Sequence, residues 1–318
     1  MLGVCRQRQQ GYTLVEIMIA LALGAILLAA SLEIYTTSRA SWADQRLGSV
    51  VVENGRVMSQ VLRSSFSNAG YYGCLPDSND KLFLNKTSGV SGLFPYIYSA
   101  GASSASSLGI TRSVESDIVT TYSVVNSTAV TTTQEHVLNG GDADQRILEF
   151  NSNINFNVDD IVVLSNCNQA TAIQVSAVNS ENNSITYSAA NCGGGDPGCT
   201  YDASATVMKL ATRRFYVAEN DRGGSSFFMK FENGAETELV EGVKDVTFLY
   251  GVDAQTYSSG SFSAGSDGSI EQYVTRSSVT DWGDVIAVRF DYTISSLGNN
   301  SVERNFSTVA MIRNFRMN

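Results

Sequence analysis

The chain has 318 residues, 43% of them hydrophobic, and carries 31 acidic against 21 basic residues, a formal net charge of −10. That length and composition suffice to fill one large core or two small ones, which argues against a disordered protein. The acidic balance argues against direct nucleic-acid binding, because counterion release from phosphates needs clustered Lys and Arg.

The amino-terminal region joins a short basic leader to an apolar run. Residues 1–11 carry Arg6 and Arg8 and no acid, and residues 17–32 contain neither proline nor charge. The positive leader predicts a cytoplasmic start with the rest of the chain sent outward. Glu16 heads the apolar run, where a carboxylate costs about 2.5 to 3.5 kcal/mol at the centre of a spanning helix. Glu16 is therefore expected to need a partner.

The junction between leader and apolar run is the most specific motif of the chain. Gly11-Tyr12-Thr13-Leu14-Val15-Glu16, followed by an apolar helix, resembles the type IV prepilin signal, which is cut before the helix. A plain secretory signal, cut after the small residues at 29–31, is the alternative, but it leaves Glu16 unexplained. That resemblance implies cleavage by prepilin peptidase after Gly11 and methylation of the new terminus at Tyr12. Glu16 would attract the terminal amine of a neighbouring subunit and set the stagger between packed helices.

The pattern predicts one helix from Tyr12 to about Phe66, roughly 80 Å long. Its first half is expected to face lipid. In the second half, apolar residues recur at steps of three and four, which predicts one stripe facing a core. The stripe comprises Leu47, Val50, Val51, Val57, Met58, Val61, Leu62 and Phe66. Asn68-Ala69-Gly70 is expected to end the helix, and Gly24, Gly48 and Gly55 are predicted to be bends or close contacts.

Beyond Tyr71 the sequence predicts antiparallel β structure with short connections. The expected strands are 117–125, 146–150, 160–165, 172–178, 206–210, 213–217, 226–231, 246–252, 285–295 and 306–313. In the clearest of them, Ile286, Val288 and Phe290 begin an alternation of period two, typical of a half-buried strand. Gly- and Ser-rich stretches at 99–107 and 257–269 are predicted to be exposed, flexible loops.

Cysteine usage predicts disulfides. Cys5 lies in the leader, which leaves Cys74, Cys167, Cys192 and Cys199 in an oxidising compartment. Four cysteines permit three pairings, and the sequence alone does not choose among them. The turn residues between Cys192 and Cys199 favour that pair, with Cys74 and Cys167 left for each other.

No set of residues indicates catalysis or a cofactor. His136 is the one histidine, and it is expected to be a solvated loop residue because no nucleophile motif accompanies it. A zinc site is not expected, since the cysteines lack the close spacing and the histidines of such sites. Asp142 and Asp144 could offer oxygens to calcium, although a polar turn is the preferred interpretation. Asp159 and Asp160 are expected to begin a strand.

A second resemblance spans most of the body. The stretches that carry it are Ala69–Cys74, Asp159–Leu164 leading to Cys167, Arg214–Val217, Glu238–Val243 with Phe248, Tyr250 and Gly251, Trp282 near a long strand, and Ile312–Asn314. In this order after a prepilin signal they resemble the PilW family of minor pilins, which is related to the J-type pseudopilins of type II secretion. That resemblance implies an α+β, type IV pilin-like fold, with a long amino-terminal helix packed on antiparallel sheet.

The resemblance also implies how the chain is divided and used. Residues 1–11 would be the leader, 12–40 the transmembrane and filament-core half of the helix, and 41–318 a periplasmic globular domain. The protein would be a single-pass inner-membrane protein that later enters the pilus, priming assembly at the tip and supporting twitching, adhesion or DNA uptake. Its partners would be other minor pilins, the major pilin, prepilin peptidase and a tip adhesin. The alternatives are a J-type pseudopilin and a tip-displayed adhesive module.

Overall fold

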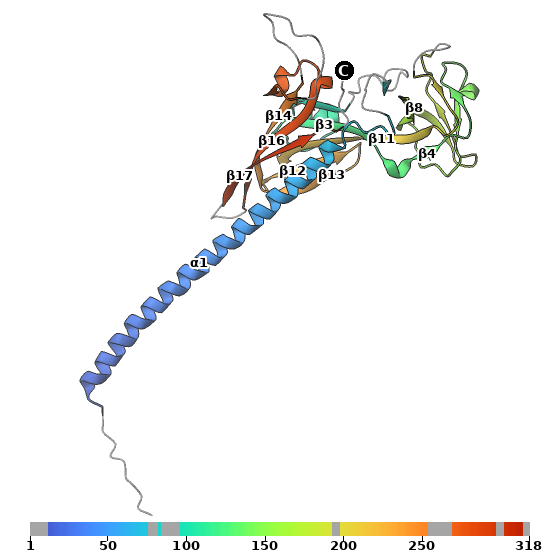
Figure 1. Ribbon diagram of the computed structural model, residues 1–318. Helices are drawn as coiled ribbons and strands as arrows, with labels where there is room; N and C mark the ends of the chain where they lie inside the picture. The colour runs from blue at the N-terminus through green and yellow to red at the C-terminus, as the bar shows by residue number, and fades with distance from the viewer. Residues whose placement is uncertain are drawn as a thin grey trace, which may run out of the picture.

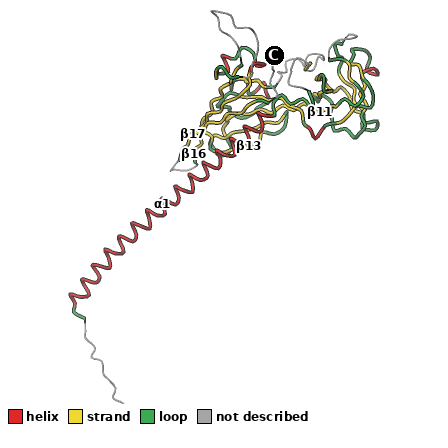
Figure 2. Tube along the Cα trace, viewed as in Figure 1, coloured by secondary structure: helices red, strands yellow, loops and turns green. Residues whose placement is uncertain are grey.

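In the computed structural model of the chain, one long helix projects from a β-rich body (Figure 1). The structure describes residues 12–75, 82–83, 96–192, 198–253, 269–296 and 302–313. Figure 2 shows that the body's regular structure is dominated by strands. The fold is therefore α+β, with antiparallel sheets behind a single amino-terminal helix, as the sequence predicts.

The helix α1 spans Leu14–Ser67 without a break. Its side chains are exposed over most of the first two thirds, and the buried positions begin at Val51. The helix ends at the cap Asn68, after which Gly70 takes a positive φ of 76° that suits glycine. The Gly70 N–H then donates to the carbonyl of Tyr122 at 2.8 Å, so the turn is tied to the body.

The last third of α1 packs on a four-stranded antiparallel sheet in the order β15-β14-β16-β17. Its strands are β14 (Val243–Val252), β15 (Gln272–Val274), β16 (Val285–Ser295) and β17 (Glu303–Met311). Met58, Leu62 and Phe66 are fully buried in the core beneath the helix. Each contributes about 1.5 to 3 kcal/mol relative to an exposed side chain, so this interface holds the helix to the body.

A larger sheet of eleven strands forms the rest of the body. Its main path is β13 (Glu236–Glu241), β12 (Ser225–Phe231), β11 (Thr206–Glu219), β7 (Ile161–Asn166), β8 (Gln169–Asn179), β9 (Ser184–Tyr187) and β6 (Ile147–Glu149). Off this path lie β1 (Leu82–Phe83), β2 (Ile97–Ala100), β3 (Ile118–Val124) and β4 (Val130–Thr131). A separate pair joins β5 (His136–Val137) to β10 (Thr200–Tyr201).

The long strand β11 connects two lobes of the body (Figure 1). Its first residues pair with β7 and β4, and its later ones pair with β3 and β12. Lys209 reinforces this junction, since its Nζ lies 2.9 Å from Asp160 and 3.0 Å from Glu232. Partial burial alone would lower the pKa of Lys209, but the hydrogen bonds to these two carboxylates raise it above its usual value.

Short 3-10 helices fill connections between the described strands: η3 (Ala102–Ser104), η4 (Ser106–Leu108), η5 (Asn126–Thr128), η6 (Ala143–Gln145), η7 (Arg276–Ser278) and η8 (Trp282–Asp284). The first two correct the prediction of a flexible loop at 99–107. Ser99 is buried in β2, and Leu108 packs against the small core around Ile110. Residues 257–268, which make up almost all of the second predicted loop, lie outside the described residues.

Candidate functional site

The start of α1 presents the residues that the prepilin resemblance singles out. The Thr13 side chain caps the helix by accepting from the Glu16 N–H at 3.3 Å. Tyr12 is 79% exposed, and Glu16 lies in the first helical turn with its side chain exposed. Gly11 and the rest of the leader lie outside the described residues. A carboxylate near a helix amino terminus is stabilised by the helix dipole.

The first part of α1 carries large apolar side chains that make few contacts with the body. Its most apolar window of 18 residues has a mean hydropathy of 2.4 and none of it is buried in the body, so α1 is long and apolar enough to cross a membrane. Leu14, Leu21, Leu27 and Ile34 are all largely exposed, at 68% or more of their surface. Contiguous apolar surface of this extent marks a membrane or protein contact, because leaving it exposed to water is unfavourable in free energy.

The docked part of α1 is fixed by a contact centred on a glycine. Gly55 is buried, and the Phe306 ring of β17 lies where a side chain at position 55 would be. The Tyr292 hydroxyl donates to the Gly55 carbonyl at 2.9 Å and lies 2.8 Å from Ser59 Oγ. Ser59 also contacts Thr308 Oγ1 at 2.7 Å. These polar contacts set how the helix lies on the sheet.

The buried stripe of α1 differs from the predicted one. The buried positions are Val51, Gly55, Met58, Leu62 and Phe66. The predicted stripe includes Val50 and Val57, but these are 49% and 38% exposed. The reason is that the sheet covers only one narrow side of the helix, and the flanking valines lie beyond it. At the other two glycines of the helix, Gly24 and Gly48, a Cβ would meet nothing within 4 Å, so neither makes a close contact.

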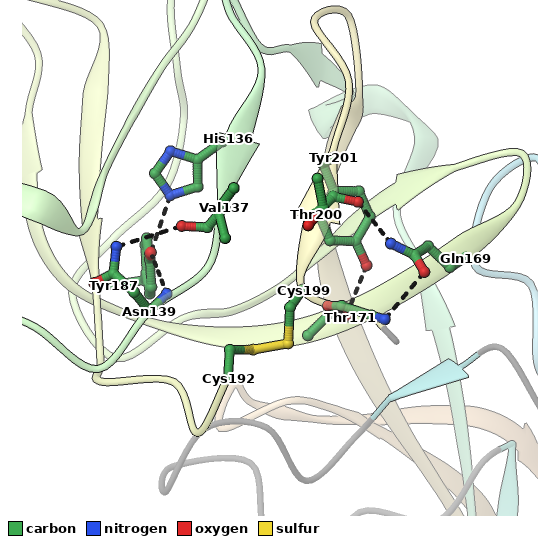
Figure 3. Close-up of a disulfide and its surroundings, with 11 residues drawn as sticks. His136, Val137, Asn139, Gln169, Thr171, Tyr187, Cys192, Cys199, Thr200 and Tyr201 are labelled. Atoms are coloured by element: carbon green, nitrogen blue, oxygen red, sulfur yellow. Dashed lines mark hydrogen bonds between the residues drawn. A yellow bond between two sulfur atoms is a disulfide. The ribbon is translucent and has the colours of Figure 1, made fainter. Parts of the chain in front are cut away.

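The four cysteines of the body form two disulfides. Cys74 joins Cys167 with their Cα atoms 4.8 Å apart, and Cys192 joins Cys199 with their Cα atoms 5.9 Å apart. The first ties the segment after α1 to the turn between β7 and β8. The second closes a loop beside β10 (Figure 3). The loop residues 193–197, whose turn chemistry favours this pairing, lie outside the described residues.

The expectation that His136 is a solvated loop residue is wrong. His136 lies in β5, half-buried, with Nε2 2.9 Å from the Tyr187 hydroxyl, which also accepts from the Asn139 N–H at 3.2 Å (Figure 3). Burial lowers the pKa of His136 below its ordinary value. Among the described residues, no nucleophile or carboxylate is hydrogen-bonded to the imidazole, so the arrangement is a structural contact between β5 and the core.

The remaining candidate carboxylates lie around a 3-10 helix and at the start of a strand. Asp144 lies in η6 and Asp142 directly precedes it, and both are exposed. Asp160 directly precedes β7, as expected, and accepts from the Asn157 N–H at 2.8 Å as well as pairing with Lys209. Within the described residues, no group of three or more His, Cys, Asp or Glu is arranged to hold a metal ion.

Comparison with known proteins agrees with this geometry. The prokaryotic N-terminal methylation motif matches residues 6–32, which covers the leader junction and the start of α1. The family Type IV Pilus-assembly protein W matches residues 214–314, which covers the later part of β11 and all of β12 to β17. No curated protein and no solved structure matches the chain.

The two matches identify the chain in two steps. The methylation motif, followed by an exposed apolar helix on an antiparallel body, defines a membrane-anchored pilin-like protein. The second match covers the sheet on which α1 docks and makes the chain similar to the PilW family, the family that the sequence motifs indicate; together the two matches support a type IV minor pilin. Proteins of the PilW family are structural components of the pilus.

Proposed function

We propose that this minor pilin joins other minor pilins to prime assembly of a type IV pilus and remains at the pilus tip. The observation that carries the proposal is the first part of α1, an exposed apolar helix that the protein's own body leaves uncovered. Lipid covers this surface before assembly, and the helices of neighbouring subunits cover it in the filament. Residues 12–40 form this shared part, and residues 41–318 form the periplasmic body.

Small residues and one charge equip this helix for packing in lipid. Ala20, Ala22, Gly24 and Ala25 reduce the bulk of the helix over nearly two turns, which lets backbones approach closely where no hydrophobic effect drives association. Glu16 offers a carboxylate to the methylated amine of a neighbour's Tyr12, and each charge relieves the cost of the other in hydrocarbon. Prepilin peptidase and the major pilin are the remaining expected partners.

The shape of the body supports a position at the tip. The lobe that contains β8 and β4 lies to one side of the α1 axis, away from the four-stranded sheet (Figure 1). A body that spreads sideways is more easily accommodated at the end of a filament, where no subunit is stacked above it. In this position the body would display its loops and any tip adhesin outward.

The test replaces Glu16 with alanine in cells that lack the wild-type chain. Glu16→Ala is expected to be cleaved and methylated normally but to fall at least about tenfold in the sheared filament fraction, because the neighbour's amine loses its partner. Mass spectrometry of the amino terminus measures processing, and immunoblotting measures incorporation. Glu33→Ala, on the same helix and also exposed, is the matched control and should assemble normally. Normal filaments and normal co-purification of Glu16→Ala with minor pilins would refute the proposal.

A further inference from the structure

Strand β17 is the open edge of the four-stranded sheet. It pairs with β16 along its whole length without a bulge, and no other described strand pairs with it. The Ile312 N–H donates to the Ile286 carbonyl at 2.9 Å, and the Ser296 N–H donates to the Val302 carbonyl at 2.9 Å. In an antiparallel ladder, hydrogen-bonded pairs alternate with pairs that are not hydrogen-bonded. Both contacts join even-numbered residues of this segment to β16, so the even-numbered residues of β17 are the ones hydrogen-bonded to β16.

The odd-numbered residues therefore point their backbone groups away from the sheet. The N–H and C=O groups of Asn305, Ser307, Val309 and Met311 face the open edge, and no backbone hydrogen bond within the described residues uses them. A nine-residue edge without proline is long for a strand left unpaired. Such an edge is a template for another extended chain.

A basic groove lies beside this edge, between the end of α1 and the end of β17. Its volume is about 700 Å³, and Val309, Ala310 and Met311 line it on the strand side. Arg56 and Arg63, two helical turns apart on α1, and Arg313 after β17 supply its charges, and no carboxylate lines it. All three arginines are exposed and form no ion pair within the described residues.

This groove contrasts with the rest of the molecule. The chain has a net charge of −10, so three unpaired arginines around one groove are a local exception. A second groove, toward the start of β17, is lined by charges of both signs: Asp44 and Glu53 together with Arg304. A basic lining selects a partner with negative charge.

We propose that an extended acidic segment of a neighbouring subunit adds to β17 as a fifth strand. Its backbone pairs with the outward groups of Ser307, Val309 and Met311. Side chains on the helix side of the added strand are carboxylates that reach Arg56 and Arg63. Side chains on the other side are apolar and cover Val309 and Met311, which are 38% and 45% exposed. Only the partner's identity as another pilus subunit rests on the function proposed above.

The test measures binding of a synthetic peptide to the full chain in detergent micelles. The peptide has about eight residues that alternate Glu with Val, matching the two sides of an added strand. A second peptide of the same sequence carries N-methyl groups on alternate amides, which keeps the charge but prevents β pairing. Fluorescence anisotropy reports affinity, and amide hydrogen exchange reports whether Ser307, Val309 and Met311 become protected.

Paired variants separate backbone pairing from charge. Val309→Pro removes an outward N–H without removing a bond to β16, whereas Val309→Ala keeps that N–H. Arg56→Glu with Arg63→Glu reverses the groove, whereas Arg56→Lys with Arg63→Lys preserves its charge. The proline and glutamate variants are expected to bind at least about tenfold more weakly than their partners. Thermal unfolding of each variant verifies that the sheet is intact.

The proposal is overturned if the unmodified peptide does not bind, if the N-methylated peptide binds equally well, or if Val309→Pro binds like Val309→Ala. Equal binding by the N-methylated peptide would identify a purely ionic attraction that any polyanion could satisfy. Because the assay contains no filament, a negative result leaves the Glu16 test of the minor-pilin function untouched. A failed Glu16 test would likewise leave the peptide result standing.

Discussion

Replacing Gly55 with alanine tests how α1 is held on the sheet. The added carbon would meet the Phe306 ring, with Cδ1 at 2.9 Å and two further ring carbons closer still. That ring cannot move freely, because it stacks on Tyr292 with centroids 5.4 Å apart. Overpacking of this kind costs about 1 to 3 kcal/mol, and the better helix propensity of alanine returns about 1 kcal/mol.

Gly48→Ala is the matched control for this substitution. It lies on the same helix with nothing within 4 Å, so it gains the propensity without the clash. The free energy of unfolding of Gly55→Ala is therefore expected to lie about 1 to 3 kcal/mol below that of Gly48→Ala. Urea unfolding of the full chain in micelles measures both, through the emission of Trp282, which is partly buried against the core, in a Trp42→Phe background. Equal stability, or a more stable Gly55→Ala, would refute the assignment of the Gly55–Phe306 contact as the tight point of the interface.

Two further predictions concern the disulfides and the buried histidine. Replacing Cys74 and Cys167 with serine should lower the free energy of unfolding by about 2 kcal/mol more than replacing Cys192 and Cys199, because the loops closed are 93 and 7 residues long; equal losses in urea unfolding would contradict this. Burial lowers the pKa of His136 below its ordinary 6.5, so the unfolded chain binds the proton first and stability should fall as the pH drops through about 6.5 toward 5. His136→Gln should flatten that part of the curve of stability against pH. If the substitution leaves the curve unchanged, the pKa of His136 is the same in the folded and the unfolded chain, which would contradict the prediction.

Local signals account for the parts of the fold that the sequence predicts well. The end of α1 lies one residue beyond the predicted Phe66, because the turn at 68–70 depends only on neighbouring residues. Strand β16 has the predicted bounds, since from Val288 to Ser295 buried residues alternate with partly buried ones. The pattern predicts two strands, at 206–210 and 213–217, where the structure has the single strand β11. It is continuous because β7 and β4 support its first part and β3 and β12 its second.

The site is only partly predictable for the same reason. The helix start at Tyr12 to Glu16 is a contiguous motif, and its exposure follows from the apolar run behind it. By contrast, the contact of Gly55 with Phe306 joins residues far apart in the chain. An isolated glycine in a helical pattern does not indicate which distant residue it contacts. The sequence prediction for His136 fails because its partner Tyr187 reaches it across 51 positions. The open edge of β17 depends on the strand order, which periodicity does not reveal.

The attachment of α1 also has a mechanical consequence. A filament under tension pulls on the membrane-proximal part of the helix, and the load enters the body near the end of α1. One route is shear across the Gly55–Phe306 contact into the four-stranded sheet. The other passes through the segment after α1 and the Cys74–Cys167 bond into the turn between β7 and β8, which is a covalent shortcut past 93 residues. The lobe farthest from the helix is thus coupled to the pull without relying on noncovalent contacts between the lobes.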